Sequence, residues 1–316
     1  MSTRQDAIIR KEDLLAIENV LYEVKKEELV ARQFLHVNNS FPIYAQEIGY
    51  DWYDMAGSAK ILAAGASAKD VPFVGEKGGR ETMKVYSIIT GIRYTKAERL
   101  AVQAKSALGK GSSVSLDTVR VAAARRFIAE TENRLVFTGD AKHGIKGILN
   151  MTGITVENVA VGATGADDAA KRLWANKTPK EILKDLLTAK TTVESGNIFK
   201  ARVLVLDSAH YNKLLQPYSD QSPMTVLKWL QSEGAFFEKI IVTGHMSSTY
   251  NGLPGSVNAF AVLDNSPEVI ELAIIEDITL GEPVYDIVGT SEQAVEERTA
   301  GCIIRHPKGI YIGKGI

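Results

Sequence analysis

The sequence contains few of the residues from which disulfide frameworks and metal centres are built: 316 residues include one cysteine and five histidines. A single cysteine, Cys302, excludes a disulfide within the chain and a zinc site made of several cysteines. It fits a reducing compartment. Because Cys302 lies in the strand-like stretch GCIIR, we expect it to be a small buried side chain.

The residues that could bind a metal ion or act as acid and base also lack the spacing that such sites need. No two histidines form an HxxxH or HxH pair, and Asp140 with His143 offers only the start of a metal site, so we expect a turn aspartate and a surface histidine there. The acidic pairs 276–277 and 296–297 are adjacent, and adjacent strand residues face opposite sides, so neither forms an acid/base dyad. The sequence therefore assigns no catalytic, cofactor-binding or metal-binding residue.

Long apolar runs and an excess of one charge are absent as well. The formal net charge is -1, so there is no overall basic field to attract nucleic acid or an anionic membrane. No stretch approaches the eighteen apolar residues of a membrane span, and the N-terminus has no apolar core of a signal peptide. We expect no membrane partner.

The residues that are present predict a globular chain with two prominent helices. Hydrophobic residues make up 45% and charged residues 24%, enough for one large or two medium domains. Residues 12–32 predict an amphipathic helix that must lie on its own core or on a neighbouring subunit. Residues 115–137 predict a helix about 30 Å long. Its expected apolar side includes Val119, Ala122, Ala123 and Phe127.

Between these two helices the residue composition changes, and after the second helix strand and helix patterns are mixed. Residues 52–80 are rich in Gly, Ala, Ser and Lys without a clear period, and residues 82–95 predict a strand. A unit this long is unusual inside a compact domain, so it is either a functional loop or an arm that reaches another chain. The second half mixes strands with helices at 178–195 and 224–234, the first capped by Thr178 and the second closed by Gly234, which predicts an α+β fold.

The stretch FTGDAKHGIKGILN, residues 137–150, has the glycines of a phosphate-binding loop but not its order. That motif needs lysine directly after the last glycine, followed by Ser or Thr. Here Ile145 precedes Lys146, and Gly147 follows. A helix also leads into this stretch, where a phosphate-binding loop would follow a strand. We therefore interpret it as a structural turn.

The string ARRFIAETENRLVFTGDAKHGIKGILN, residues 124–150, resembles the major capsid proteins of tailed phages and their encapsulin relatives, which share the Hong Kong 97 phage fold. In these chains a long helix ends in a pattern like E-N-R-x-x-F-x-G-D, followed by G-I-x-G-[IL]-L-N. Both patterns occur here, at 132–140 and 144–150. Weaker similarity extends over 68–103, 224–234 and 297–316.

The resemblance implies a Hong Kong 97-like α+β capsid fold with an N-terminal arm, an extended β loop, a peripheral domain with a long spine helix, and an axial domain. The implied ranges are 1–50 for the arm, 51–105 for the extended loop, 106–200 for the peripheral domain with its spine helix at 115–137, 201–290 for the axial domain, and 291–316 for a strand returning to the peripheral domain.

The same resemblance gives the glycine-rich turn a structural role after the spine helix. Gly139, Gly144 and Gly147 would supply backbone freedom, and Asp140 would hydrogen-bond nearby backbone N–H groups. The chain would then return to the core by Asn150. Lysines 60, 69, 77 and 84 in the loop region match no isopeptide cross-linking motif, so we expect no covalent chemistry.

The function implied is that of a structural major capsid protein without enzymatic activity, which self-assembles into an icosahedral phage head enclosing double-stranded DNA. Its expected partners are further copies in hexamers and pentamers, a portal, and packaged DNA contacted without sequence readout. Only about forty residues precede the loop, so we expect the scaffold to be a separate protein. The expected location is the virion capsid, assembled in the host cytoplasm, and no cofactor is expected.

Two alternatives remain open at this point. An encapsulin nanocompartment would have the same fold but an internal pocket for a cargo peptide. A soluble α+β enzyme with a nonlocal active site would instead be a monomer or small oligomer with a deep polar pocket.

Overall fold

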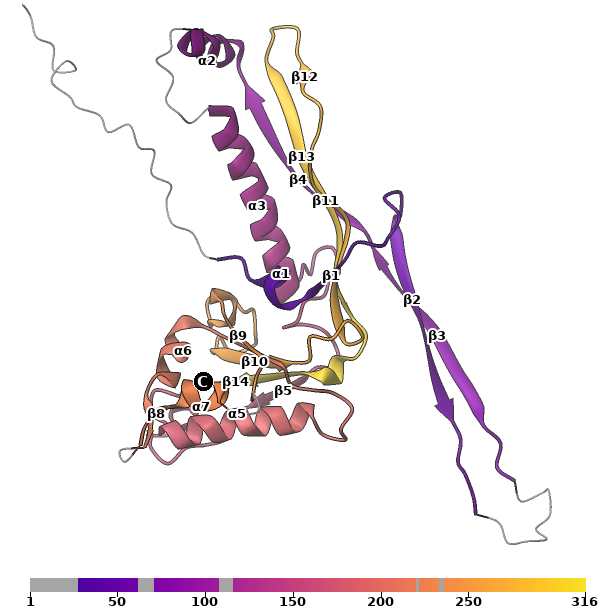
Figure 1. Cartoon of the computed structure of the whole chain (residues 1–316), viewed down its shortest axis with the longest axis vertical. Helices are drawn as coiled ribbons and strands as arrows, with labels where there is room; N and C mark the ends of the chain where they lie inside the picture. The colour runs from indigo at the N-terminus through magenta and orange to yellow at the C-terminus, as the bar shows by residue number, and fades with distance from the viewer. Residues whose placement is uncertain (1–27, 62–70, 108–115, 220–221, 233–235) are drawn as a thin grey trace, which may run out of the picture.

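The computed structural model describes residues 28–61, 71–107, 116–219, 222–232 and 236–316. Figure 1 shows three parts: a lower body that contains the C-terminus, a long upright part built on helix α3, and a two-stranded hairpin that points away from both. Most of the helix expected at 12–32 lies outside the described residues. Of that region the structure describes only the last residues and the short helix α1 (Ala31–Phe34) that follows.

The lower body contains a five-stranded sheet in the order β5-β14-β10-β6-β9. Its strands are β5 (Thr155–Asn158), β6 (Val203–Leu206), β9 (Lys239–Val242), β10 (Ala259–Leu263) and β14 (Ile310–Lys314). β10 runs antiparallel to both β14 and β6, whereas β14 with β5 and β6 with β9 are parallel. Every residue of β6 and β10 is buried, because core side chains pack on both faces of the sheet.

Helices cover the lower face of this sheet (Figure 1). They and the small elements around them are α4 (Asp168–Arg172), α5 (Pro179–Val193), α6 (Ser208–Leu214), α7 (Val226–Gln231), β7 (Pro217–Ser219), β8 (Ser222–Thr225), and the 3-10 turns η2 (Gly244–Met246) and η3 (Pro307–Gly309). The prediction for α5 is confirmed in detail. The Thr178 hydroxyl accepts from the Glu181 N–H, the Glu181 carboxylate accepts from the Thr178 N–H, and Pro179 is the first helical residue.

The helix expected at 224–234 is shorter than predicted. Met224 and Thr225 belong to β8, and the Thr225 hydroxyl caps the helix by accepting from the Lys228 N–H. The helix then ends at Gln231, and Gly234 lies outside the described residues. A capping threonine takes an extended backbone, so the helix can begin only after it.

The upright part is built on a second sheet, in the order β1-β11-β13-β12 with β4 paired to the other side of β13. These strands are β1 (His36–Asn38), β4 (Tyr86–Tyr94), β11 (Ile270–Leu280), β12 (Val284–Tyr285) and β13 (Ser291–Ile304). β13 is therefore an interior strand here, as β14 is in the lower sheet. Cys302 on β13 is buried, as predicted, and burial raises the pKa of its thiol.

Helix α3 (Leu116–Thr138) lies along β4 and β13, while α2 (Lys96–Ala107) sits at the far end beside β12 (Figure 1). The long helix is confirmed, but most of its predicted apolar side is not buried, Leu135 being the exception. Ala124 and Ile128 are buried against the sheet, whereas Phe127 is 53% exposed. The helix buries a stripe that includes Glu132, and a carboxylate at a core position misleads a search for apolar periodicity.

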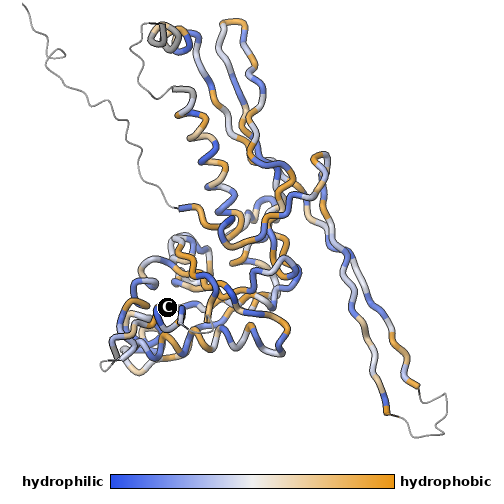
Figure 2. The backbone as a smooth tube through the Cα atoms, in the orientation of Figure 1, coloured by the Kyte–Doolittle hydropathy of each residue, from blue (hydrophilic) through white to orange (hydrophobic). Residues whose placement is uncertain are grey.

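The hairpin consists of β2 (Glu47–Ala56) and β3 (Gly75–Lys84), paired from Glu47 with Lys84 to Ala56 with Gly75. The strand expected at 82–95 is divided in the structure: β3 ends at Lys84 in the hairpin, and β4 begins at Tyr86 in the upright sheet. Figure 2 shows hydrophobic positions interspersed with hydrophilic ones along the hairpin. Almost all of its residues are exposed.

Candidate functional site

The turn after α3 contains the residues that the sequence singled out, which are Gly139, Asp140, Gly144, Gly147 and Asn150. Its centre is a bridge in which the backbone N–H groups of Asp140 and Ile145 each donate to the other's carbonyl at 2.9 Å. The Asp140 carboxylate accepts from the Lys142 N–H at 2.9 Å and lies 2.7 Å from His143 Nδ1. These hydrogen bonds, first the one with His143, lower the pKa of Asp140.

Two glycines in this turn are required by close backbone approach. A Cβ on Gly147 would lie 2.6 Å from the Phe137 carbonyl oxygen, and one on Gly139 would lie 2.3 Å from the Ile145 carbonyl oxygen. Gly139 also has φ +64°, and Gly144 has φ +73° at a point with open space around it. The turn therefore needs glycine at each position, for partly different reasons.

Asn150 joins the two sides of the turn. Its side-chain oxygen accepts from the Gly147 N–H at 2.7 Å, and its amide donates to the Thr138 carbonyl at 2.7 Å. The N–H groups of Ile148 and Leu149 donate to the carbonyls of Val136 and Phe137, each at 2.9 Å. The chain thus doubles back along the last turn of α3 and carries two apolar residues into the core.

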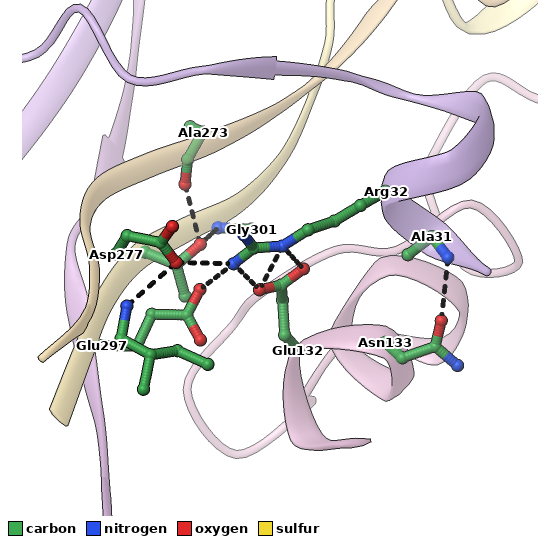
Figure 3. A network of polar contacts seen from close by, with 10 residues as sticks. Ala31, Arg32, Glu132, Asn133, Ala273, Asp277, Glu297 and Gly301 are labelled. Carbon is green, nitrogen blue, oxygen red and sulfur yellow. Dashed lines mark hydrogen bonds and ion pairs between the residues drawn. The ribbon is translucent and has the colours of Figure 1, made fainter. Parts of the chain in front are cut away.

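A second group of polar residues, which was not predicted as a group, meets near the same end of α3. Arg32 donates from Nε to the two Glu132 carboxylate oxygens at 2.8 and 3.0 Å, and its Nη2 reaches Asp277 and Glu297, each at 3.1 Å (Figure 3). The next residue of α3, Asn133, accepts with its side-chain oxygen from the Ala31 N–H at 3.0 Å. Arg32, Glu132, Asp277 and Glu297 are called the arginine cluster below.

The arginine cluster places one cation against three carboxylates in a largely buried space. The Glu132 and Glu297 side chains are 4% and 0% exposed. Burial, and then the neighbouring Glu132 carboxylate, raises the pKa of Glu297 to about 9. Hydrogen bonding to Glu132 raises the pKa of Arg32. Arg32 thus lies in contact with both buried carboxyl groups.

The cluster fixes α1 to three other elements. Arg32 belongs to α1, Glu132 comes from α3, and Asp277 and Glu297 come from β11 and β13. Sequence reasoning noted Glu132 within a motif and Glu297 within an adjacent acidic pair. It missed the cluster because the three carboxylates lie 100 to 265 residues from Arg32 along the chain.

The sequence model described as "Major capsid protein" matches residues 57–316, well over half of the chain. The chain belongs to the major capsid protein family. The search of curated proteins found no match to the sequence. The remaining comparisons are with solved structures and concern the fold.

Several solved capsid and particle structures have this fold. The capsid of Myoviridae phage XM1 superposes with a TM-score of 0.79 at 14% identity, over 99% of this chain and 100% of that one. Mycobacterium phage Bobi gives 0.62 at 12% identity, over 98% of each chain. A virus-like particle from Pyrococcus furiosus gives 0.55 at 18% identity, over 90% of this chain and 91% of that one.

The expected Hong Kong 97-like α+β capsid fold is thereby confirmed, and so is a structural role in the virion capsid. A capsid protein of this kind assembles with further copies of itself into a shell. The functional sites of such a protein are the surfaces through which subunits join and the contacts that hold each subunit in shape.

The hairpin is the part of this capsid protein that its own chain covers least. Tyr53 is 74%, Met55 68% and Phe73 87% exposed. Along the hairpin, Arg80 pairs with Asp51 at 2.6 Å, and this contact lowers the pKa of Asp51. Exposed ion pairs of this kind contribute little to stability.

The capsid protein has further buried polar groups in the lower body. Lys177 Nζ lies 2.5 Å from Asp185, which also accepts from the Trp174 indole N–H at 3.0 Å. Asp207 caps α6 and also contacts the His210 ring. Both sets hold α5 and α6 in place.

Among the residues that the structure describes, no group of three or more His, Cys, Asp or Glu side chains could hold a metal ion. In the same part of the capsid protein, no helix has both the length and the apolar character needed to cross a membrane.

Proposed function

We propose that this capsid protein is the building block of an icosahedral tailed-phage head, closed from hexamers and pentamers of the chain around double-stranded DNA. The observation that carries the proposal is the hairpin formed by β2 and β3. It extends away from the rest of the subunit and has almost no cover of its own (Figure 1). The proposal extends the structural capsid role with a specific way of joining subunits.

The hairpin is an unusual element for an isolated subunit. A two-stranded ribbon is marginally stable in water, and both its edges offer unpaired backbone groups. Exposed apolar side chains at Tyr53, Met55 and Phe73 add surface that is better buried. A neighbouring copy of the chain would bury these side chains, and repetition around a closed shell would multiply a modest contact many times.

The domains that the resemblance implied can be assigned to the parts of the subunit as part of this proposal. We assign the hairpin to the extended loop, α3 with the β11–β13 sheet to the peripheral domain, and the lower body to the axial domain. Because β5 and α5 pack with the lower sheet, we move the start of the axial domain from residue 201 to about residue 155. The hairpin begins at Glu47, which moves the start of the loop from residue 51.

The turn at 138–150 is proposed as the connector between the long helix and the lower body. Asn150 and the Asp140–Ile145 bridge keep its two sides together. The glycines at 139, 144 and 147 permit its tight path. In this role Lys146 has no ligand to bind, and the resemblance to a phosphate loop is coincidental.

Portal, scaffold and DNA contacts complete the proposal. We infer that a portal occupies one vertex and that a separate scaffold protein guides assembly. With a net charge of -1, the chain would contact DNA through local Lys and Arg side chains on the inner surface, without sequence readout. An encapsulin shell would share the fold, but the family match does not favour it.

Deletion of residues 56–80, with a short Gly-Ser linker in their place, tests the role of the hairpin. We expect a folded subunit whose far-ultraviolet circular dichroism spectrum loses only the contribution of the deleted strand residues. We expect no closed shells by negative-stain microscopy after size-exclusion chromatography. A matched control exchanges Asp51 and Arg80 and keeps their pair. Intact shells from the deletion variant would overturn the proposed role of the hairpin.

A further inference from the structure

The hairpin joins the rest of the subunit at one end and extends away from it (Figure 1). At that end Ile48 is buried in a small cluster with Ala273 of β11 and with Ala300 and Ile303 of β13. Apolar contacts of this kind have no preferred direction. They hold the base of the hairpin in place more firmly than they fix the angle at which the hairpin extends.

The base of the hairpin also borders open space. A cavity of about 390 Å³ lies between the hairpin and the turn at 138–150. It is lined by Tyr50 and Glu81 on the hairpin side and by His143 and Lys146 on the side of the turn. Because side chains do not fill this space, packing alone does not prevent the hairpin from tilting toward the turn.

The chain enters the hairpin through a short turn, which the Ala45 N–H closes by donating to the Pro42 carbonyl at 2.9 Å. The two central side chains of this turn, Ile43 and Tyr44, are 62% and 85% exposed, so they give it no anchor in the core. Arg298 of β13 supplies an anchor. Its Nη1 donates to the Ile43 carbonyl, and its Nη2 donates to the Ala45 carbonyl at 2.8 Å.

An irregularity in β13 places the Arg298 side chain on this side of the sheet. Gly301 and Thr299 pair with consecutive residues of β11, so Ala300 is an extra residue that forms a β-bulge. Gly301 takes the left-handed conformation with φ +78°, and the Thr299 hydroxyl accepts from its N–H at 3.0 Å. Arg298 and Ile303 would face opposite sides of an unbroken strand, because they are five residues apart. The extra residue brings both to the base of the hairpin.

The guanidinium group suits this position. It is a planar fork with donors in fixed directions, whereas the lysine ammonium is a single charge on a flexible stem. One rigid fork that donates to two carbonyl groups restricts the orientation of the turn relative to β13. Because β2 begins at Glu47, two residues after Ala45, the orientation of the turn also sets the direction in which the hairpin starts.

We propose that Arg298 is the residue that positions the hairpin: by holding the turn before β2, it sets the angle at which the hairpin extends from the subunit. The consequence for assembly rests on the proposed role of the hairpin in joining subunits, since a hairpin held at one angle meets the same place on every neighbour. The effect within the subunit does not depend on that role.

Pulsed electron paramagnetic resonance on the unassembled full-length subunit measures the position of the hairpin. In a Cys302→Ala background, spin labels are placed at two exposed positions, Lys77→Cys in the hairpin and Lys184→Cys in α5. We expect a narrow distribution of label distances in the parent and one at least twice as wide in Arg298→Met. Arg298→Lys keeps the charge but not the fork and should also widen the distribution. Equal widths for the parent and Arg298→Met would overturn the proposal.

Arg93→Met is the matched control. Arg93 lies on β4 and pairs with Glu292, so this substitution removes an arginine contact from the same sheet and leaves the base of the hairpin untouched. The distance distribution should keep its parental width. If Arg93→Met widens it as much as Arg298→Met does, the effect is a general loosening of the sheet and the proposed role of Arg298 is wrong.

Hydrogen exchange gives a second readout without labels and checks folding as well. The Val85 N–H donates to the Gln46 carbonyl at 2.9 Å across the base of the hairpin. We expect the peptide that contains Val85 to exchange at least fivefold faster in Arg298→Met, while peptides from β10 exchange as in the parent. Unchanged exchange at Val85 would contradict the proposal. Should Arg298→Met fail to fold, Arg298→Lys decides by the same two criteria.

Shell formation separates this inference from the proposed role of the hairpin. If Arg298→Met widens the distance distribution but forms shells of parental yield and diameter, the positioning role is supported and the hairpin is not the element that joins subunits. If the distribution stays narrow while shells are defective, the positioning role of Arg298 is overturned and the role of the hairpin stands.

Discussion

Glu297 makes the stability of the subunit depend on pH because it is buried beside a second carboxylate. The pKa of Glu297 rises from 4.5 to about 9 on folding, so the folded state holds this proton more tightly than the unfolded state. The stabilisation is fully present below about pH 4.5, and the free energy of unfolding falls as the pH rises toward 9.

Glu297→Gln should remove this dependence, because an amide resembles the protonated carboxyl group and cannot ionise. We expect the variant to be more stable than the parent at pH 8.5 by about 4 kcal/mol, and within about 1 kcal/mol of it at pH 5. Urea unfolding of the unassembled subunit at both pH values measures this. Glu296→Gln, on the neighbouring and less buried residue, should keep the parental slope. Identical slopes for the parent and Glu297→Gln would show that Glu297 is ionised in the folded state.

Gly147 is limited by space and Gly144 by backbone conformation, so alanine should affect them differently. Gly147→Ala pushes a Cβ against the Phe137 carbonyl oxygen, at 2.6 Å, and only a backbone shift can relieve the contact. We expect a loss of about 2–4 kcal/mol. Gly144→Ala has open space and should lose about 1–2 kcal/mol for its left-handed conformation. Urea unfolding compares them, and equal losses would mean that the turn relaxes freely around residue 147.

At the scale of elements, the arginine cluster ties the chain before β1 to α3 and to the upright sheet. Arg32→Met would leave the Glu132 carboxylate buried without its cation, and we expect a loss of about 2–3 kcal/mol. The double variant Arg32→Met with Glu132→Met removes both charges and should lose less than the sum of the two single variants. A double-mutant cycle by urea unfolding measures the coupling. Additivity within about 0.5 kcal/mol would show that the pair is not coupled.

Elements differ in how far the sequence determines them. Helix α5 follows from local signals alone: a capping threonine, a proline at the first position and a regular apolar stripe. The length of α3 follows from the same kind of signal, but its buried side does not. Phe127 lies outward and Glu132 inward because contacts with Arg32 and with the upright sheet decide the orientation.

The turn at 138–150 and the arginine cluster, both near the C-terminal end of α3, also differ in how far the sequence determines them. The turn at 138–150 was noticed because its glycines and Asn150 are close in sequence. The arginine cluster was missed because Arg32, Glu132 and Glu297 are brought together only by the tertiary structure, in which β1 and β13 both pair with β11. Local pattern carries no information about such partners.

At the scale of the whole molecule, the assembly surface proposed on the hairpin and the core that folds each subunit lie in different places. Tyr53→Ser with Met55→Ser changes two exposed hairpin residues and should alter the subunit's free energy of unfolding by no more than about 0.5 kcal/mol. If the hairpin lies on a neighbour, shell yield should fall at least tenfold by sedimentation and microscopy.

Val262→Ala, in the buried strand β10, is the matched control that changes the core and leaves the hairpin intact. It should destabilise the subunit by about 1–3 kcal/mol and reduce shells only in proportion to the unfolded fraction. If the hairpin double variant forms shells at normal yield, the Tyr53 and Met55 side chains do not contribute to the assembly surface.

The interior positions of β13 and β14 have a consequence for the order of events during synthesis. Both strands come from residues 291–316, and each is hydrogen-bonded on both sides, in the upright and the lower sheet respectively. While the ribosome is still translating, β4 and β11 lack the strand between them, and so do β5 and β10. Neither sheet can close, and a prematurely terminated chain is left with open edges and exposed apolar faces. Synthesis of residues 291–316 thus acts as a checkpoint, and only chains that contain these residues acquire the shape that a shell can accept.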